Sequence, residues 1–452
     1  MSSFSFHLTQ NSSASLSLYL HCKQLTMFQD NNDGSSSITS LSPRMAAGGF
    51  GSLCHWFKEL KPEERGLYLI HLLLTCANHV AAGALDSANV ALDQISHLAS
   101  PDGDTMQRIA SYFAEALADR ILRTWPGLYK ALHSTRLPAL SDQVKAKKML
   151  YDLFPFLKVA FMVTNQAIIE AMEGEKLVHI IDLNAAEPTQ WRPLLQDLSA
   201  RPEGPPHLRI TGVHPHREVL DQTARALTDE AEKLDIPFQF TPIVTNLETL
   251  DFRQLRVKTG EALAITSSLK LHTLLAHNDE PGKNPQRPGD HYFLENHKIK
   301  GFLDALRGLS PKILIISEQE SNHNGEKLME RLSESLHYYA ALFDCLESTL
   351  PRTSSERLKA EKMVLGEEIK NIIACEGMER KERHEKLEKW FWRLGSSGFW
   401  NVALSYYAML QARRYLQSCR CDGYNVKEEN GCVVICWQDR ALFSVSCWRC
   451  RR

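Results

Sequence analysis

The sequence of 452 residues lacks the features that would bring a protein to a membrane or to nucleic acid by bulk charge. No apolar run approaches the roughly 20 residues that span a bilayer, and residues 16–25 lack the basic flank and cleavage site of a secretory signal. Basic and acidic residues number 52 and 54, so the formal net charge is only -2. No whole-chain field therefore attracts DNA or an anionic surface. We expect an intracellular protein that has no membrane partner and whose DNA contact is local or indirect.

Motifs of the common enzyme classes are also missing. The chain has no G-x-S-x-G nucleophile turn, no H-E-x-x-H zinc motif and no phosphate-binding P-loop. Glu318-Gln319-Glu320 follows a predicted strand, where α/β enzymes place chemistry, but acids at such positions also cap helices and bind loops. We therefore predict no enzyme activity, no catalytic residue, no cofactor and no metal site.

Glycine is missing from the one loop in which a nucleotide-binding fold needs it. Residues 184–188, Asn-Ala-Ala-Glu-Pro, lie between a buried strand and a helix, yet offer no glycine through which the backbone could approach a phosphate. Glu187 adds a negative charge there, and Pro188 removes a donor N–H. Asp182 could still bind a ribose, but His214-Pro215-His216 replaces the acid expected after the second strand. The pattern predicts a nucleotide-type unit without a soluble nucleotide.

Alternating apolar strands and amphipathic helices predict the fold class. Apolar runs predict parallel strands at residues 177–183, 208–213, 238–243, 262–265 and 312–316. Helical periodicity follows at residues 219–234, 325–350, 355–375, 380–394 and 402–419. Three short runs, at residues 424–428, 432–437 and 442–448, predict an antiparallel meander at the sheet edge. We predict an α/β, Rossmann-like (methyltransferase-like) doubly wound and mostly parallel sheet with C-terminal antiparallel strands.

The N-terminal part predicts a tail followed by a helical cap. Residues 1–52 are rich in Ser, Asn and Gln, which is typical of a disordered segment. Residues 62–122 have helical apolar spacing, broken at Gly83 and at residues 101–103, and indicate packed helices whose leucines form an internal core rather than a zipper. The alternating charges of residues 380–386 predict a solvated helix face.

The cysteines, which are possible metal ligands, cluster near the C-terminus. Six of eleven cysteines lie in the last 34 residues, and Cys447 and Cys450 have a C-x-x-C spacing. The other spacings complete no standard zinc pattern, and Cys432 and Cys436 lie in a predicted strand where burial explains them. We expect these cysteines to be reduced and free of zinc.

Several segments, taken in order, match a known family. Val178-His179-Ile180-Ile181-Asp182 is followed by Gln190-Trp191, and residues 156–171 precede it as a helical element. Residues 383–390, 405–407 and 446–449 follow later in the chain. These segments resemble the VHIID, PFYRE and SAW regions of the GRAS family of plant transcriptional regulators, over residues 55–452. Two departures are Cys447, where SAW has alanine, and a short loop at residues 278–300.

The resemblance implies a tail over 1–52 and a GRAS domain over 53–452. Its regions would be leucine-rich region I with the helical cap (62–135), VHIID (145–214), leucine-rich region II (215–250), PFYRE (260–375) and SAW (376–452). It also implies a nuclear co-regulator of gibberellin signalling that acts against DELLA repressors. Such a protein would bind C2H2 zinc-finger factors and other GRAS proteins. Residues 27–30, Met-Phe-Gln-Asp, resemble the usual start of the protein, so we expect residues 1–26 to be an upstream extension.

The VHIID strand and nearby aromatic residues are the candidate site. We expect Val178, Ile180 and Ile181 to be core, each costing roughly 1–3 kcal/mol of stability when mutated. Because Trp and Arg dominate interface energetics, other residues are candidates for orienting loops or binding partners, although buried packing is expected for at least half of them: His179, Gln190, Trp191, Trp437, Trp448 and Arg449.

Overall fold

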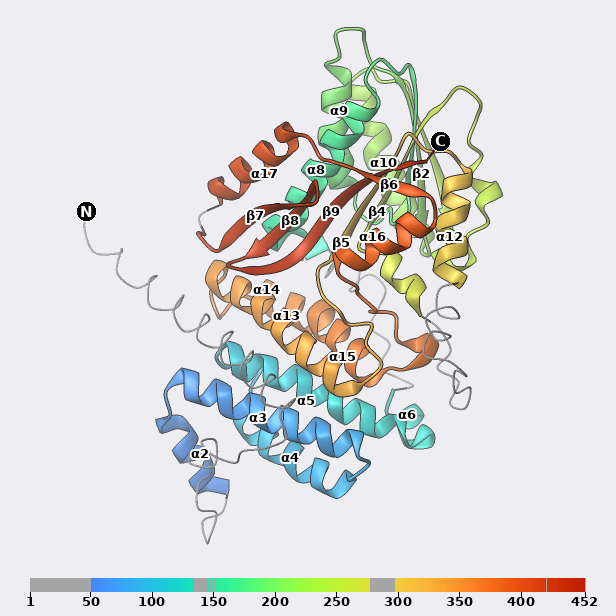
Figure 1. Cartoon of the computed structure of the whole chain (residues 1–452). Coiled ribbons are helices and arrows are strands. Elements are labelled where there is room, and N and C mark those ends of the chain that lie inside the picture. The colour runs from blue at the N-terminus through green and yellow to red at the C-terminus, as the bar shows by residue number, and fades with distance from the viewer. Residues whose placement is uncertain are drawn as a thin grey trace, which may run out of the picture. The chain divides into compact units, whose positions relative to one another are not determined.

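A computed structural model describes residues 50–133, 151–276, 297–419 and 421–451, with positions 145, 148 and 149. The chain divides into two compact units (Figure 1). The helical unit takes its described residues from 1–146 and 325–375, and the sheet unit from 147–324 and 376–452. Residues 1–49, which include the expected upstream extension, and most of the 278–300 loop lie outside the described residues. No described helix combines the length and apolar character needed to cross a membrane.

A nine-stranded sheet organises the sheet unit. Its strands are β1 (Leu177–Asp182), β2 (His207–His214), β3 (Phe238–Val244), β4 (Ala262–Ser268), β5 (Ile313–Gln319), β6 (Phe399–Val402), β7 (Tyr424–Glu429), β8 (Cys432–Trp437) and β9 (Arg440–Cys450). The order β3-β2-β1-β4-β5-β9-β8-β7 is parallel as far as β5 and antiparallel beyond it, and β6 also pairs with β9. The predicted fold class is confirmed.

Helices connect and flank these strands. In the described residues of the sheet unit they are α8 (Pro155–Ala171), α9 (Trp191–Ser199), α10 (Arg217–Lys233), α12 (His297–Gly308), α16 (Leu387–Ser396) and α17 (Tyr406–Ser418). Short 3₁₀ turns follow strand ends at Pro188–Gln190, Leu247–Thr249, Phe252–Leu255 and Leu271–Leu275. A proline at the start of α8 fits the first helical turn, where a backbone N–H has no partner.

The helical unit is built from two separate stretches of chain. The first contains α2 (Phe50–Glu59), α3 (Pro62–Ala81), α4 (Leu85–Leu98), α5 (Thr105–Arg123) and α6 (Pro126–His133); the second contains α13 (Leu328–Thr349), α14 (Ser355–Ala360), a π-helical turn (Glu361–Leu365) and α15 (Gly366–Ala374). Leu69, Leu73 and Ile109 are fully buried, so the leucine spacing does form an internal core. A Cβ on Gly366 would lie 2.9 Å from Tyr112 Cδ1, which shows how closely α15 packs against α5.

Two helices near the C-terminus begin later than predicted, and the solvated helix face predicted for residues 380–386 is wrong. The run 380–386 has no regular secondary structure, and α16 begins only at Leu387. Arg383 and His384 are completely buried, and Arg383 donates to the carbonyl of Gly377 at 3.2 Å. Alternating charges suggest ion pairs on the exposed face of a helix. Here the basic groups instead bind backbone carbonyls and buried acids. The helix predicted over 402–419 also starts later, because residues 399–402 form the edge strand β6.

Candidate functional site

The carboxylate at the end of β1 is already occupied by protein groups. Asp182 Oδ2 accepts a hydrogen bond from Trp191 Nε1 at 3.1 Å, and its Oδ1 accepts one from the Asn184 N–H at 3.0 Å. Burial raises the pKa of Asp182 to about 6, against the lowering effect of these two bonds. Asp182 is only 4% exposed, and Trp191 only 1%. The acid that could bind a ribose instead anchors the start of α9.

The loop after β1 is packed onto the neighbouring strands. Asn184 Nδ2 donates to the Ser268 carbonyl at 2.8 Å, and the Ala185 N–H donates to the Val213 carbonyl at 3.1 Å. A Cβ on Gly212 would lie 2.7 Å from the Cβ of Ala185, so the one glycine nearby serves this close packing. Ala185 is thus buried against β2, at the strand end where a related fold binds its nucleotide. The residues present do not fit a phosphate-binding loop.

His179, the second residue of the VHIID strand, belongs to a buried polar network. The His179 Nε2 atom lies 2.8 Å from Thr211 Oγ1, and its Nδ1 atom lies 3.1 Å from Arg209 Nη2. Arg209 also forms an ion pair with Glu261. Burial, followed by the charge of Arg209, lowers the pKa of His179 to about 4, so its ring is neutral. This network ties β1 to β2 and to the residue before β4.

The three tryptophans among the candidate residues are buried. Trp191 and Trp448 are 1% exposed and Trp437 is 3% exposed. Trp448 Nε1 donates to Ser446 Oγ at 2.9 Å. Gln190 is buried as well, and its carbonyl accepts a hydrogen bond from a side-chain amide of α8. Because these four side chains are buried, they are suited to orienting loops and not to direct contact with a partner protein.

Arg449 is the exposed member of the candidate set. It lies opposite Trp400 in the β6–β9 register, and Trp400 is 50% exposed. Tyr406 and Tyr407 follow at the start of α17 and are 76% and 54% exposed. Sequence reasoning missed this surface. Trp400 lies just before the helix predicted over 402–419, and the strand that carries it, β6, has only four residues.

The strand-end acids of β5 bind loops and cap a helix. Glu318 Oε1 accepts hydrogen bonds from the backbone N–H groups of Lys270 (3.2 Å) and Leu271 (2.8 Å). Glu320 accepts the Leu387 N–H at the start of α16 through both oxygens, at 3.0 Å each. These contacts support the architectural interpretation of the two acids.

A chain of buried histidines, joined by the half-buried Glu382, continues from Glu318. Glu318 Oε2 lies 2.7 Å from His272 Nδ1, and His272 Nε2 lies 3.0 Å from Glu382 Oε2. Burial lowers the pKa of His272, but the charge of Glu318 and hydrogen bonds to Glu318 and Glu382 raise it to about 10. His384 and His323 extend the chain. Sequence reasoning missed this cluster, because its members come from three distant segments and two of them lie in the run assigned to a solvated helix.

The described cysteines of the last strands are thiols in the protein interior. Cys432, Cys436 and Cys447 are buried, and none of the described cysteines forms a disulfide. Burial raises the pKa of Cys432 to about 12 and that of Cys436 to about 11. Such thiols hold their protons, in agreement with the packing role expected for Cys432 and Cys436.

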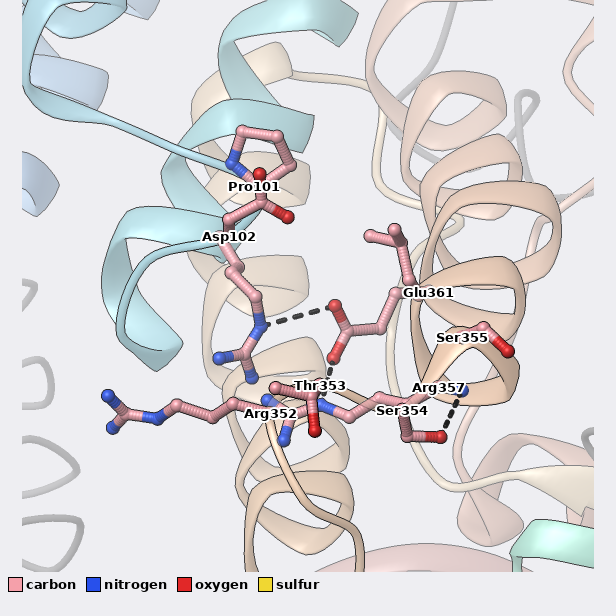
Figure 2. A pocket seen from close by; sticks show the side chains of 10 residues that line it. Pro101, Asp102, Arg352, Thr353, Ser354, Ser355, Arg357 and Glu361 are labelled. Carbon is pink, nitrogen blue, oxygen red and sulfur yellow. Dashed lines mark hydrogen bonds and ion pairs between the residues drawn. The ribbon is translucent and has the colours of Figure 1, made fainter.

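The helical unit has its own polar pocket, a cavity of about 210 Å³ (Figure 2). Glu361 accepts hydrogen bonds there from Arg357 Nε at 2.9 Å and from Arg108 Nε at 3.1 Å. Arg108 also pairs with Glu347 at 2.9 Å. The acids balance the guanidinium groups, so the pocket is a buried ion-pair network that joins α5 to α13 and α14.

The comparisons with known proteins agree with this architecture. The profile of the GRAS domain family matches residues 69–449. The chain belongs to the GRAS family. It is 56% identical to Scarecrow-like protein 3 of Arabidopsis thaliana, over 95% of this chain and 100% of that protein. It is also 38% identical to the DELLA protein GAI1 of Vitis vinifera, over 92% of this chain and 68% of GAI1. It is therefore a plant regulator of the GRAS family and a relative of the DELLA proteins.

A solved GRAS structure shows the same fold. The crystal structure of SCL7 from Oryza sativa superposes with a TM-score of 0.70 at 30% identity, and the match covers 84% of this chain and 99% of SCL7.

Proposed function

We propose that this GRAS protein is a nuclear transcriptional co-regulator that acts as a protein–protein adaptor and not as an enzyme. The hydrogen bond between Trp191 and Asp182 carries the proposal, because it occupies the carboxylate that would bind a ribose in a related fold. The similarity to Scarecrow-like protein 3 over its whole length supports a role as a GRAS regulator, and we propose that this role lies in gibberellin responses. In this role the protein antagonises DELLA-type repressors and is recruited to promoters by C2H2 zinc-finger factors.

The exposed pair Trp400 and Arg449 is the part of the described surface that best fits a partner. Both side chains come from paired positions of β6 and β9, which hold them at fixed separation. Tryptophan and arginine are enriched among the hot spots of protein interfaces. We place the contact with a zinc-finger factor or a second GRAS protein there.

A gel mobility-shift titration of the full chain on promoter DNA tests the proposal. The chain is added alone and then with a C2H2 factor that binds the probe. The adaptor interpretation expects a supershift only when the factor is present. A shift by the chain alone, with an affinity that falls steeply as salt rises, would instead identify a direct DNA binder.

Calorimetric titration with S-adenosylmethionine tests the enzyme alternative. The closed loop predicts no binding, and a saturable heat would overturn the adaptor assignment. The DELLA relationship is tested by adding a DELLA protein to the supershifted complex, where antagonism predicts competition for the factor. A fluorescent fusion of the full chain tests the nuclear location.

A further inference from the structure

Three distant segments of the sheet unit bring imidazole and carboxylate groups to one buried point. His272 lies in the turn after β4, His323 follows β5, and Glu382 and His384 precede α16. His272 and His384 are 3% and 0% exposed. The ligand atoms of His272, Glu382 and His384 all lie within 4.8 Å of one another.

The distances among these three groups match those of a metal site. Glu382 Oε2 lies 3.0 Å from His272 Nε2 and 3.2 Å from His384 Nε2. Zinc binds imidazole nitrogen and carboxylate oxygen at about 2.0–2.2 Å in tetrahedral geometry, which separates neighbouring ligand atoms by about 3.3 Å. The two carboxylate–imidazole separations are therefore close to this value, and the two imidazole nitrogens lie within 4.8 Å of each other.

The remaining ring nitrogens of both histidines are held as they are in metal proteins. His272 Nδ1 lies 2.7 Å from Glu318 Oε2, which forms a carboxylate–histidine pair behind the candidate ligand. His384 Nδ1 lies 2.9 Å from His323 Nδ1, and His323 Nε2 lies 2.9 Å from Ser321 Oγ. These outer contacts leave the Nε2 atoms of His272 and His384 facing the same carboxylate.

His384 Nε2 is the atom that the protein alone does not satisfy. It is buried and makes no hydrogen bond within the described part of the chain, although Glu382 Oε2 is 3.2 Å away. A buried polar atom without a partner is costly, and a bound ion removes that cost.

We propose that His272, Glu382 and His384 bind a zinc ion that fastens the segment before α16 to the ends of β4 and β5. Two imidazoles and one carboxylate suit zinc, whereas magnesium and calcium prefer oxygen ligands only. The ion takes the place of the proton on His272 Nε2, and Glu318 and Glu382 offset its two positive charges. Three protein ligands leave the fourth tetrahedral position to a water molecule. We assign the ion a structural role because it joins the turn after β4 to the segment before α16.

The test uses the full chain, stripped with a chelator and then titrated with Zn²⁺ against a chromophoric competitor. We expect one high-affinity equivalent in the wild type. Glu382→Gln and His384→Gln should lose it, and Glu318→Gln should weaken it by about 10–100-fold. His179→Gln is the matched control, since it alters another buried histidine of the same sheet and should keep the equivalent.

Co²⁺ substitution of the wild type identifies the ligand class without any variant, and it decides the question if the variants fail to fold. Nitrogen and oxygen ligands predict visible bands with no thiolate charge-transfer absorption. The proposal is overturned if the wild type binds no equivalent, if both ligand variants keep it, or if a thiolate band assigns the ion to cysteine.

Discussion

The indole nitrogen of Trp191 donates a hydrogen bond to the carboxylate of Asp182 at 3.1 Å, and both side chains are buried. Asp182 ends the VHIID strand and Trp191 begins α9. The bond therefore links two sequence motifs of the family through one contact. It also turns a position suited to ligand binding into part of the core.

Removing this bond should destabilise the sheet unit. Trp191→Phe keeps most of the ring volume but withdraws the donor from a buried carboxylate, which typically costs about 1–3 kcal/mol. Urea denaturation followed by circular dichroism measures the loss. Trp400→Phe is the control, because an exposed aromatic exchange should stay within about 0.5 kcal/mol. Equal effects of the two variants would contradict the assignment.

Asp182 should make stability depend on pH in an unusual direction. Its pKa is raised to about 6 in the folded chain, from 3.8. Between these values the folded state binds more protons than the unfolded state, so this contribution to stability falls as pH rises, by about 3 kcal/mol in total. Asp182→Asn removes the titration. The wild-type minus variant difference in unfolding free energy should therefore decrease from pH 4 to pH 7, and a rising difference would refute the prediction.

The ion-pair network of the helical unit should be sensitive to loss of one acid. Glu361→Gln removes one of the two acids that pair with the buried Arg108 and Arg357, while Glu347 still pairs with both. The loss should therefore lie near the lower end of the about 3–5 kcal/mol that a broken buried pair costs. Thermal unfolding measures the effect. Lys327→Ala is the control in the same unit, because its ion pair with Glu330 is exposed and such pairs are worth about 0–1 kcal/mol. A small loss for Glu361→Gln would show that the network contributes little.

The surface pair should affect binding but not folding. Trp400→Ala and Arg449→Ala should each weaken the complex with a C2H2 factor, by about 30-fold if the residue is a hot spot worth about 2 kcal/mol. Surface plasmon resonance measures the affinity, and circular dichroism verifies the fold. Val90→Ala, at an exposed position of the helical unit, should leave binding unchanged. Unchanged affinity in both surface variants would move the interface elsewhere.

The parallel strands were predictable because their apolar character is continuous. A strand buried on both faces, such as β1, needs apolar side chains at successive positions, and that pattern is visible without the fold. The short strand β6 was not predictable from the sequence. Its four residues pair with β9 and carry no periodic pattern of apolar residues.

Burial of charge is the feature that the sequence concealed. Alternating signs in residues 380–386 look the same whether the groups face water or the interior. Arg383 donates to the backbone carbonyls of Arg380 and Gly377. His384 Nδ1 lies 2.9 Å from His323 Nδ1, and local spacing does not reveal this partner 61 residues away. The missing glycines predicted a loop without a soluble nucleotide, but the burial of Ala185 and the bond from Trp191 to Asp182 depend on contacts that the sequence does not reveal.

The helical unit draws α3–α5 from one end of the chain and α13–α15 from a stretch inserted between β5 and β6. A truncated allele that starts after His133 would thus strip α13 and α15 of the helices that pack on them. The product would expose apolar surface and attract chaperones and proteases. Loss of function in such an allele would report failed protein quality control rather than a missing N-terminal activity.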